Sequence, residues 1–214
     1  NKVDYPEKNA RVAEMRFLRA NNYFWLKVNF RYAPFIDETI PVSDYNQVGN
    51  ELNDEQLWNK IIEDLQFAVD ELPESYPAGD IGRPTAFAAK AYLAKVLLYA
   101  AYEQDGRNQV ININADKLNQ VITLCDDVLQ RSGKHLFADF GDNFECGTQN
   151  GPESIWAIQF SHNDGTPTGR INGTNEVVYP MVEQYGCCGY HSPSQNLVNA
   201  FRTVNGLPDF DNYN

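Results

Sequence analysis

The stretch GRPTAFAAKAYLAKVLLYAA, residues 82–101, decides the fold of this chain of 214 residues. Alanine is its commonest residue, and Lys90 and Lys95 carry the only charges between Pro84 and Ala101. A transmembrane helix needs about 20 consecutive, mostly apolar residues. Both lysines would lie near the middle of such a span, where each costs about 2.5–3.5 kcal/mol on insertion scales. The stretch is therefore predicted to be a buried helix and not a membrane span.

The apolar side chains of this helix fall into two stripes. At helical spacing one stripe holds Ala89, Leu93, Val96 and Ala100, and the other holds Ala91, Ala94, Leu98 and Tyr102. Two apolar stripes indicate neighbours on both sides, and the alanines allow those neighbours to approach closely. The prediction is a helix from Pro84 to about Gln104 that lies between other helices in a stack of helical hairpins.

Three further helices are predicted from apolar residues that recur every three or four positions, over about 6–32, 54–72 and 115–131. Asn53 and Gln56 have the spacing of a capping box. Asn114 is suited to cap the helix that follows it. Connections of about ten residues favour antiparallel neighbours. The inward side chains expected on helix 115–131 are Leu118, Val121, Ile122, Cys125, Val128 and Leu129.

The helical pattern stops after Arg131. Residues 153–161 alternate like a short strand, whereas 162–193 are rich in Gly, Asn and Tyr and have no periodicity. A structureless stretch of that length is often functional. A last helix is expected to begin near Ser194. The predicted organisation is one mainly α domain over 1–214, with helical hairpins over 1–135 and a loop-rich part with a short strand and the final helix over 136–214.

Composition narrows the classes of ligand that this protein is expected to bind. The net charge is −12, from 17 basic and 29 acidic residues, which argues against nucleic acid because phosphate contacts need clustered Lys and Arg. An acidic surface suits neutral ligands such as sugars, although it can equally serve solubility alone. Cys125 is expected to be a small core residue. Cys146 could form a disulfide with either Cys187 or Cys188 in an oxidising compartment.

The tyrosine-rich stretch 162–193 holds the candidate ligand-binding residues. Sugar binding uses flat aromatic faces together with planar hydrogen-bonding groups. The alternative is that these tyrosines only hold a long loop against the helices. The candidates are Tyr179, Tyr185, Tyr190, Arg170, Asn172, Asn175 and His191.

Catalytic and metal-binding motifs do not emerge from the sequence. It contains no G-x-S-x-G, no H-E-x-x-H and no P-loop, and no pair of carboxylates has the context of a glycosidase dyad. Zinc could in principle be held by Cys146, Cys187, Cys188 and His191, but adjacent cysteines are awkward ligands. We expect a protein that is not an enzyme and that needs no metal or cofactor.

Five segments, in the same order along the chain, resemble landmarks of the SusD/RagB family. Arg16, Arg19 and Arg83 fall inside these segments, and Arg83 is expected to bridge an acidic partner or a helix C-terminus. Asn205 stands where the family usually has Asp. The segments are RFLRANNYFWLKVNFRYAPFI (16–36), LWNKIIEDLQFAVDELP (57–73), the opening stretch (82–101), PESIWAIQF (152–160) and SPSQNLVNAFRTVNGLP (192–208).

The resemblance implies a fold of tetratricopeptide-like helical hairpins packed against an irregular, loop-rich part. It implies cell-surface binding of a polysaccharide, an oligosaccharide or another nutrient, for delivery to a SusC-like TonB-dependent transporter in the outer membrane. It also implies a lipid anchor that lies outside this chain, which would then be an interior portion of a longer protein. The alternative is a helical-repeat scaffold that binds a protein and no carbohydrate.

Overall fold

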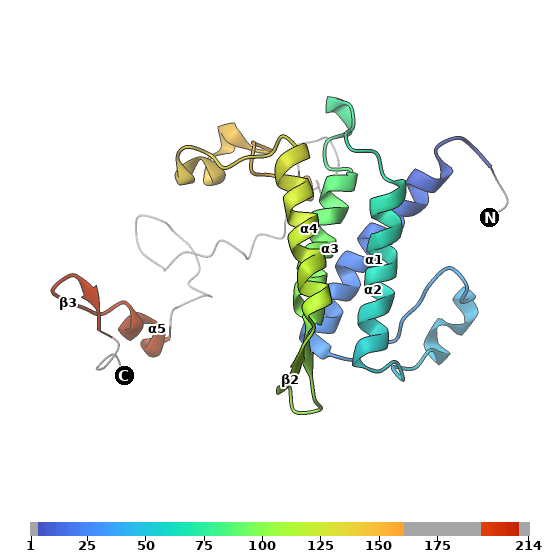
Figure 1. Cartoon of the computed structure of the whole chain (residues 1–214), viewed down its shortest axis with the longest axis horizontal. Coiled ribbons are helices and arrows are strands. Elements are labelled where there is room, and N and C mark those ends of the chain that lie inside the picture. Colours follow the sequence, from blue (N-terminus) through green and yellow to red (C-terminus); the bar gives the residue numbers. More distant parts are fainter. Residues whose placement is uncertain (1–3, 161–193, 210–214) are drawn as a thin grey trace, which may run out of the picture. The chain divides into compact units, whose positions relative to one another are not determined.

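The computed structural model describes residues 4–160 and 194–209, which fall into two compact units, Asn1–Gln159 and Phe160–Asn214. The first unit contains four long helices, α1 (Lys8–Phe30), α2 (Asp54–Glu71), α3 (Ala86–Ala101) and α4 (Ala115–Arg131). They run alongside one another, and α1 packs on α2, α2 on α3 and α3 on α4 (Figure 1). The mainly α fold of stacked helical hairpins is confirmed.

Helix α3 is buried between its two neighbours, as its composition predicted. Thr85 caps its N-terminus by accepting a hydrogen bond from the Ala88 N–H. The first predicted stripe, from Ala89 to Ala100, is buried throughout. The second stripe is buried only in part, because Leu98 and Tyr102 are each 42% exposed. Within the described residues, no helix is both long and apolar enough to span a bilayer.

The two lysines of α3 each contact a neighbouring helix. Lys90 forms an ion pair with Asp127 of α4 at 2.5 Å. Lys95 lies about 5 Å from the ring centres of Phe24 and Trp25 of α1, within the range of a cation–π contact. One lysine therefore joins α3 to α4, and the other joins α3 to α1.

Strand β1 (Tyr102–Gln104) begins where α3 was expected to continue. It pairs antiparallel with β2 (Val110–Ile113), and this hairpin was not predicted from the sequence. The Asp105 side chain accepts hydrogen bonds from the N–H groups of Arg107 and Gln109, and Asn108 has a φ of 62°. Asp and Asn favour such turns because their side chains bond to nearby backbone and Asn tolerates positive φ.

The N-terminus of α2 is capped by its own residues and paired with a lysine of α1. The capping box is confirmed, because the Asn53 side chain accepts from the Gln56 N–H and the Gln56 side chain accepts from the Asn53 N–H. Lys27, only 4% exposed, pairs with Asp54 in the first turn of α2. Burial lowers the pKa of Lys27, and the bond to Asp54 partly offsets this.

Helix α4 begins at Ala115 and ends at Arg131 as predicted, and Asn114 caps it by accepting from the Lys117 N–H. Its predicted inward face is partly wrong. Val128 is buried, but Cys125 is exposed and Ile122 and Leu129 are 59% and 71% exposed. The physical reason is that α4 packs on α3 with one side only, so half of its wide apolar stripe has no neighbour among the described residues.

The short strand expected over 153–161 is absent from its described part, 153–160. The segment is held by side-chain bonds and not by a strand ladder. The Trp156 indole N–H donates to the Gly82 carbonyl at 2.8 Å, and the amides of Asn150 and Gln159 bond each other at 2.9 Å. Short 3₁₀ turns complete the unit at Val42–Gln47, Ala78–Asp80, Phe140–Phe144 and Cys146–Thr148.

The described part of the second unit is a helix followed by a small hairpin. The final helix predicted near Ser194 is confirmed as α5 (Gln195–Ala200), capped by the Ser194 side chain. Strands β3 (Thr203–Val204) and β4 (Leu207–Pro208) pair antiparallel. Asn205 and Gly206 form the turn with φ values of 54° and 81°. Two positive φ values in a two-residue loop match the twist of a hairpin, and Asn with Gly is the preferred pair there.

Leu93 and Leu98 allow a matched test of the burial of α3, since they are 2% and 42% exposed on one helix. Leu93→Ala is expected to lower the free energy of unfolding by about 2–5 kcal/mol, because it leaves a cavity in the core. Leu98→Ala should cost less than about 1 kcal/mol. Urea unfolding measures both, and equal losses would mean that α3 is not buried as described.

A second prediction concerns Glu38. Hydrogen bonds from Arg19, from backbone and from Arg16 lower the pKa of Glu38 to about 2. Because the folded pKa is below the unfolded one, the stabilisation is present above about pH 4.5 and is lost as the pH falls toward 2. Glu38→Gln should therefore flatten the pH dependence of the unfolding midpoint between these values. Glu63→Gln, at an exposed site on α2, is the control that should leave it unchanged.

Candidate functional site

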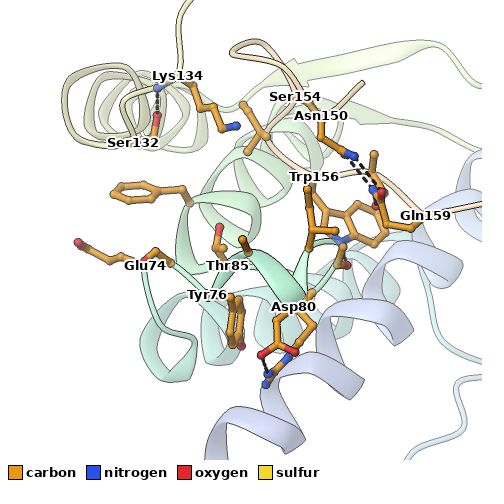
Figure 2. Close-up of a pocket in the computed structure, with 18 of the residues that line it drawn as sticks. Glu74, Tyr76, Asp80, Thr85, Ser132, Lys134, Asn150, Ser154, Trp156 and Gln159 are labelled. Atoms are coloured by element: carbon orange, nitrogen blue, oxygen red, sulfur yellow. Dashed lines mark hydrogen bonds and ion pairs between the residues drawn. The ribbon is translucent and has the colours of Figure 1, made fainter. Parts of the chain in front are cut away.

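A cavity of about 310 Å³ lies between the α2–α3 connection, the end of α4 and the segment 150–159 (Figure 2). This volume falls at the small end of the range found for ligand pockets. All of its walls belong to the first unit. Tyr76, Phe87 and Trp156 contribute aromatic surface, and hydroxyl, amide and charged side chains lie between them.

Gly82 fixes how the two main walls meet. Its φ is +95°, a conformation that side chains rarely adopt, and an added Cβ would lie 2.6 Å from Cγ of Gln159. Its carbonyl accepts the hydrogen bond from Trp156. Glycine is therefore required here both for the backbone conformation and for the close approach of the opposite wall.

Arg83 and Glu14 anchor the first wall to α1. Arg83 Nε donates to Oε1 of Glu14 at 2.7 Å, and Arg83 also pairs with Asp80 at 2.8 Å. The acidic partner expected for Arg83 is thus confirmed. Burial tends to lower the pKa of Arg83, but the bonds to Glu14 and Asp80 raise it overall.

Tyr76 is held by the same pair. Its hydroxyl donates to Oε1 of Glu14 at 3.0 Å, and the Arg83 guanidinium lies 4.0 Å from the ring centre. Burial, followed by the hydrogen bond to Glu14, raises the pKa of Tyr76 to about 12. The phenol therefore stays neutral at physiological pH and its ring is fixed in the wall.

The second wall is fixed by Trp156, Asn150 and Gln159. The Trp156 ring meets Phe17 of α1 edge to face, with ring centres 4.9 Å apart. The paired amides of Asn150 and Gln159 close one side of the cavity, as the dashed lines in Figure 2 show. A site whose side chains are locked before a ligand arrives loses little entropy on binding.

The carboxylates of the lining are engaged in ion pairs. Glu74 pairs with Arg131 at the end of α4, and Asp80 pairs with Arg83. The cavity thus presents aromatic faces and hydrogen-bonding groups, and its carboxylates are paired with arginines.

The seven candidate residues of the tyrosine-rich stretch, Arg170 to His191, lie outside the described residues. The same holds for Cys187 and Cys188, and with them the disulfide alternatives for Cys146. Among residues 4–160 and 194–209, no cluster of three or more His, Cys, Asp or Glu side chains could hold a metal. The cavity itself was not predicted. Gly82, Arg83 and Gln159 lie in segments that resemble the family, but Lys134 and Asn150 carry no signal in the sequence.

The helical hairpins hold a preformed cavity, and comparison with known proteins shows the family to which this fold belongs. No family model matches the chain. A SusD-like protein of Bacteroides ovatus is 32% identical over 158 residues, covering 74% of this chain. SusD-like protein P25 of Formosa agariphila is 25% identical over 150 residues, covering 70% of this chain.

Solved structures of SusD-like proteins share the fold of this chain. A SusD-like protein of Bacteroides fragilis, 23% identical, shares the fold with a TM-score of 0.61 over 76% of this chain and 30% of its own. A structure described with xylogluco-oligosaccharide is 31% identical, with a TM-score of 0.57 over 72% of this chain and 30% of its own. A laminarin binding SusD-like protein is 25% identical, with a TM-score of 0.60 over 72% of this chain and 32% of its own.

The chain belongs to the SusD-like family. It spans 28% and 25% of the lengths of the two curated relatives.

Substitution of Gly82 tests whether this residue holds the two walls of the cavity together. Gly82→Ala is expected to lower the free energy of unfolding by about 1–3 kcal/mol, because it adds backbone strain and a collision with Gln159. Gly79→Ala is the matched control, since an added Cβ there meets nothing within 4 Å. Its effect should stay within about 0.5 kcal/mol. If thermal or urea unfolding gave the same value for both variants, Gly82 would not hold the walls together.

Proposed function

We propose that this protein binds a glycan without transforming it and passes it to a TonB-dependent transporter. The observation that carries the proposal is the 31% identical structure described with xylogluco-oligosaccharide. The laminarin binding relative, 25% identical, supports the same ligand class. The two named ligands are neutral glucans or glucan-based oligosaccharides, which suits a chain of net charge −12.

The proposal extends to the rest of the predicted site. We assign the main contacts with the glycan to the tyrosine-rich stretch, namely Tyr179, Tyr185, Tyr190, Arg170, Asn172, Asn175 and His191. Aromatic rings stack on sugar rings, and Arg, Asn and His bond to hydroxyl groups. In this proposal residues 1–214 belong to a single SusD-like domain.

The proposed location is the outer surface of the outer membrane, with attachment through a lipid outside this chain. A binding protein there meets glycans before they cross the membrane, and a SusC-like transporter beside it removes them. Binding without turnover suits this role, because hydrolysis at the wrong place would release the product to the medium.

A protein-binding scaffold is the second candidate, and one observation favours it. Ile122, Cys125 and Leu129 form an exposed apolar stripe along α4, and Leu136 nearby in sequence is 79% exposed. Contiguous exposed apolar surface often marks a protein contact. Contact with a transporter would satisfy both candidates, so the discriminating measurement is glycan binding itself.

Affinity electrophoresis in gels containing laminarin or xyloglucan tests the proposal. The protein is expected to be retarded by at least one polysaccharide, and Tyr185→Ala or Tyr190→Ala should weaken this by about tenfold, the loss of a stacked ring. Tyr45→Ala, in the 3₁₀ turn Val42–Gln47, is the control that should bind normally. Absence of retardation with a panel of neutral and acidic polysaccharides would favour the scaffold. Release of shorter sugars would contradict binding without turnover.

A further inference from the structure

We propose that the cavity beside α3 is a separate subsite for an anionic sugar residue, one that carries a carboxylate or a sulfate, and that Lys134 recognises its charge. This inference rests on the proposed function for the general ligand class, since it names one sugar residue of the glycan. The proposed subsite is separate from the tyrosine-rich stretch 162–193, because the cavity is formed wholly by residues 74–159 of the first unit.

Lys134 is the lining cation that lacks a carboxylate partner. Its ammonium group donates to the Gly151 carbonyl at 3.5 Å, at the limit of a hydrogen bond, and it makes no ion pair with any residue of the described ranges. An ammonium group has three donors. At least two of them therefore remain available to a ligand.

Each of the other charged side chains of the lining has an ion-pair partner. Glu74 pairs with Arg131, and Arg83 pairs with both Asp80 and Glu14. Glu153, which borders the adjoining groove together with Lys134, accepts instead from the Phe137 N–H at 2.8 Å. Among the charged side chains of the lining, Lys134 is therefore the one that has no ion-pair partner within the described residues, and an anionic group would supply one.

The placement of Lys134 suits a ligand inside the cavity. It follows α4 directly and reaches toward the segment 150–159, as Figure 2 shows, while its backbone N–H bonds the Ser132 hydroxyl. Ser75 and Ser154 offer hydroxyl groups to the ring of a sugar, and Tyr76 and Phe87 offer apolar surface. A cavity of about 310 Å³ has room for one small sugar unit.

The net charge of −12 does not prevent this binding. Charges more than about 8 Å away are largely screened at physiological ionic strength, whereas a partly buried contact is screened much less. A direct bond between an ammonium group and an anion is stronger than a bond between neutral groups. The local charge at Lys134 therefore outweighs the distant acidic surface for a ligand already in the cavity.

Three methyl glycosides that differ only at C6 test the subsite: methyl glucoside, methyl glucuronide and methyl glucoside 6-sulfate. Titrations of the isotope-labelled protein, followed through the backbone amide signals of Gly151 and Ser154, give each affinity. We expect both anionic sugars to bind about tenfold more tightly than the neutral one, corresponding to about 1.4 kcal/mol. A lysine is a point charge with no bidentate geometry, so it should accept both anions.

Lys134→Gln is the decisive variant, because it should abolish the preference for the anions and leave the weak binding of methyl glucoside unchanged. Lys60→Gln, at an exposed lysine of α2, is the matched control and should keep the preference. Ser75→Trp, a bulky substitution in the lining, should remove all three sugars. Raising the salt concentration should weaken the anions only.

The possible failures are distinguishable from failure of the proposed function. Equal affinities for the three sugars in the wild-type protein, or a preference that survives Lys134→Gln, overturn the subsite. Absence of any sugar from the cavity, with laminarin or xyloglucan still bound, overturns the subsite and leaves the proposed function intact. A preference that depends on Lys134 without binding of any polysaccharide supports the subsite and contradicts the proposed function.

Discussion

The buried ion pair between Glu14 and Arg83 is the interaction on which the rest of the first unit depends. Glu14 is 5% exposed on α1, whereas Arg83 lies just before the N-terminus of α3, where the helix dipole disfavours a positive charge. Glu14 and Asp80 offset this unfavourable placement. Removal of one member of such a pair leaves a charge in a dry environment, which is strongly destabilising. Because α1 packs mainly on α2, the pair also provides a direct link from α1 to the start of α3.

The short run Gly82-Arg83-Pro84-Thr85 combines several local requirements. Gly82 allows the positive φ and the close approach of Gln159, Arg83 reaches Glu14, and Thr85 caps α3. Pro84, buried before the cap, has the fixed φ of an extended entry to the helix. These requirements act on consecutive residues, so one substitution would disturb the helix, the α1 contact and the cavity together.

Much of this fold could be predicted from the sequence because its signals are local. The capping box at Asn53, the cap at Asn114 and the bounds of α4 all follow from side chains that act on neighbouring backbone. The exposure of Ile122 and Leu129 could not be predicted, because an apolar stripe shows which face avoids water but not how many helices cover it. The β1–β2 hairpin was missed because the apolar pattern of α3 continues through Tyr102.

The residues of the cavity also divide into some that the sequence indicates and some that it does not. Its frame rests on Glu14, Gly82 and Arg83, all of which lie in or beside motifs that resemble the family, whereas Lys134 lies outside every motif. The role of Lys134 arises only from the pairing of the charges around it, which no spacing in the sequence encodes. A frame fixed by buried ion pairs can keep its shape while a residue of the lining changes, because that residue carries no part of the packing. Ligand preference at such a site can therefore vary among relatives that share the fold.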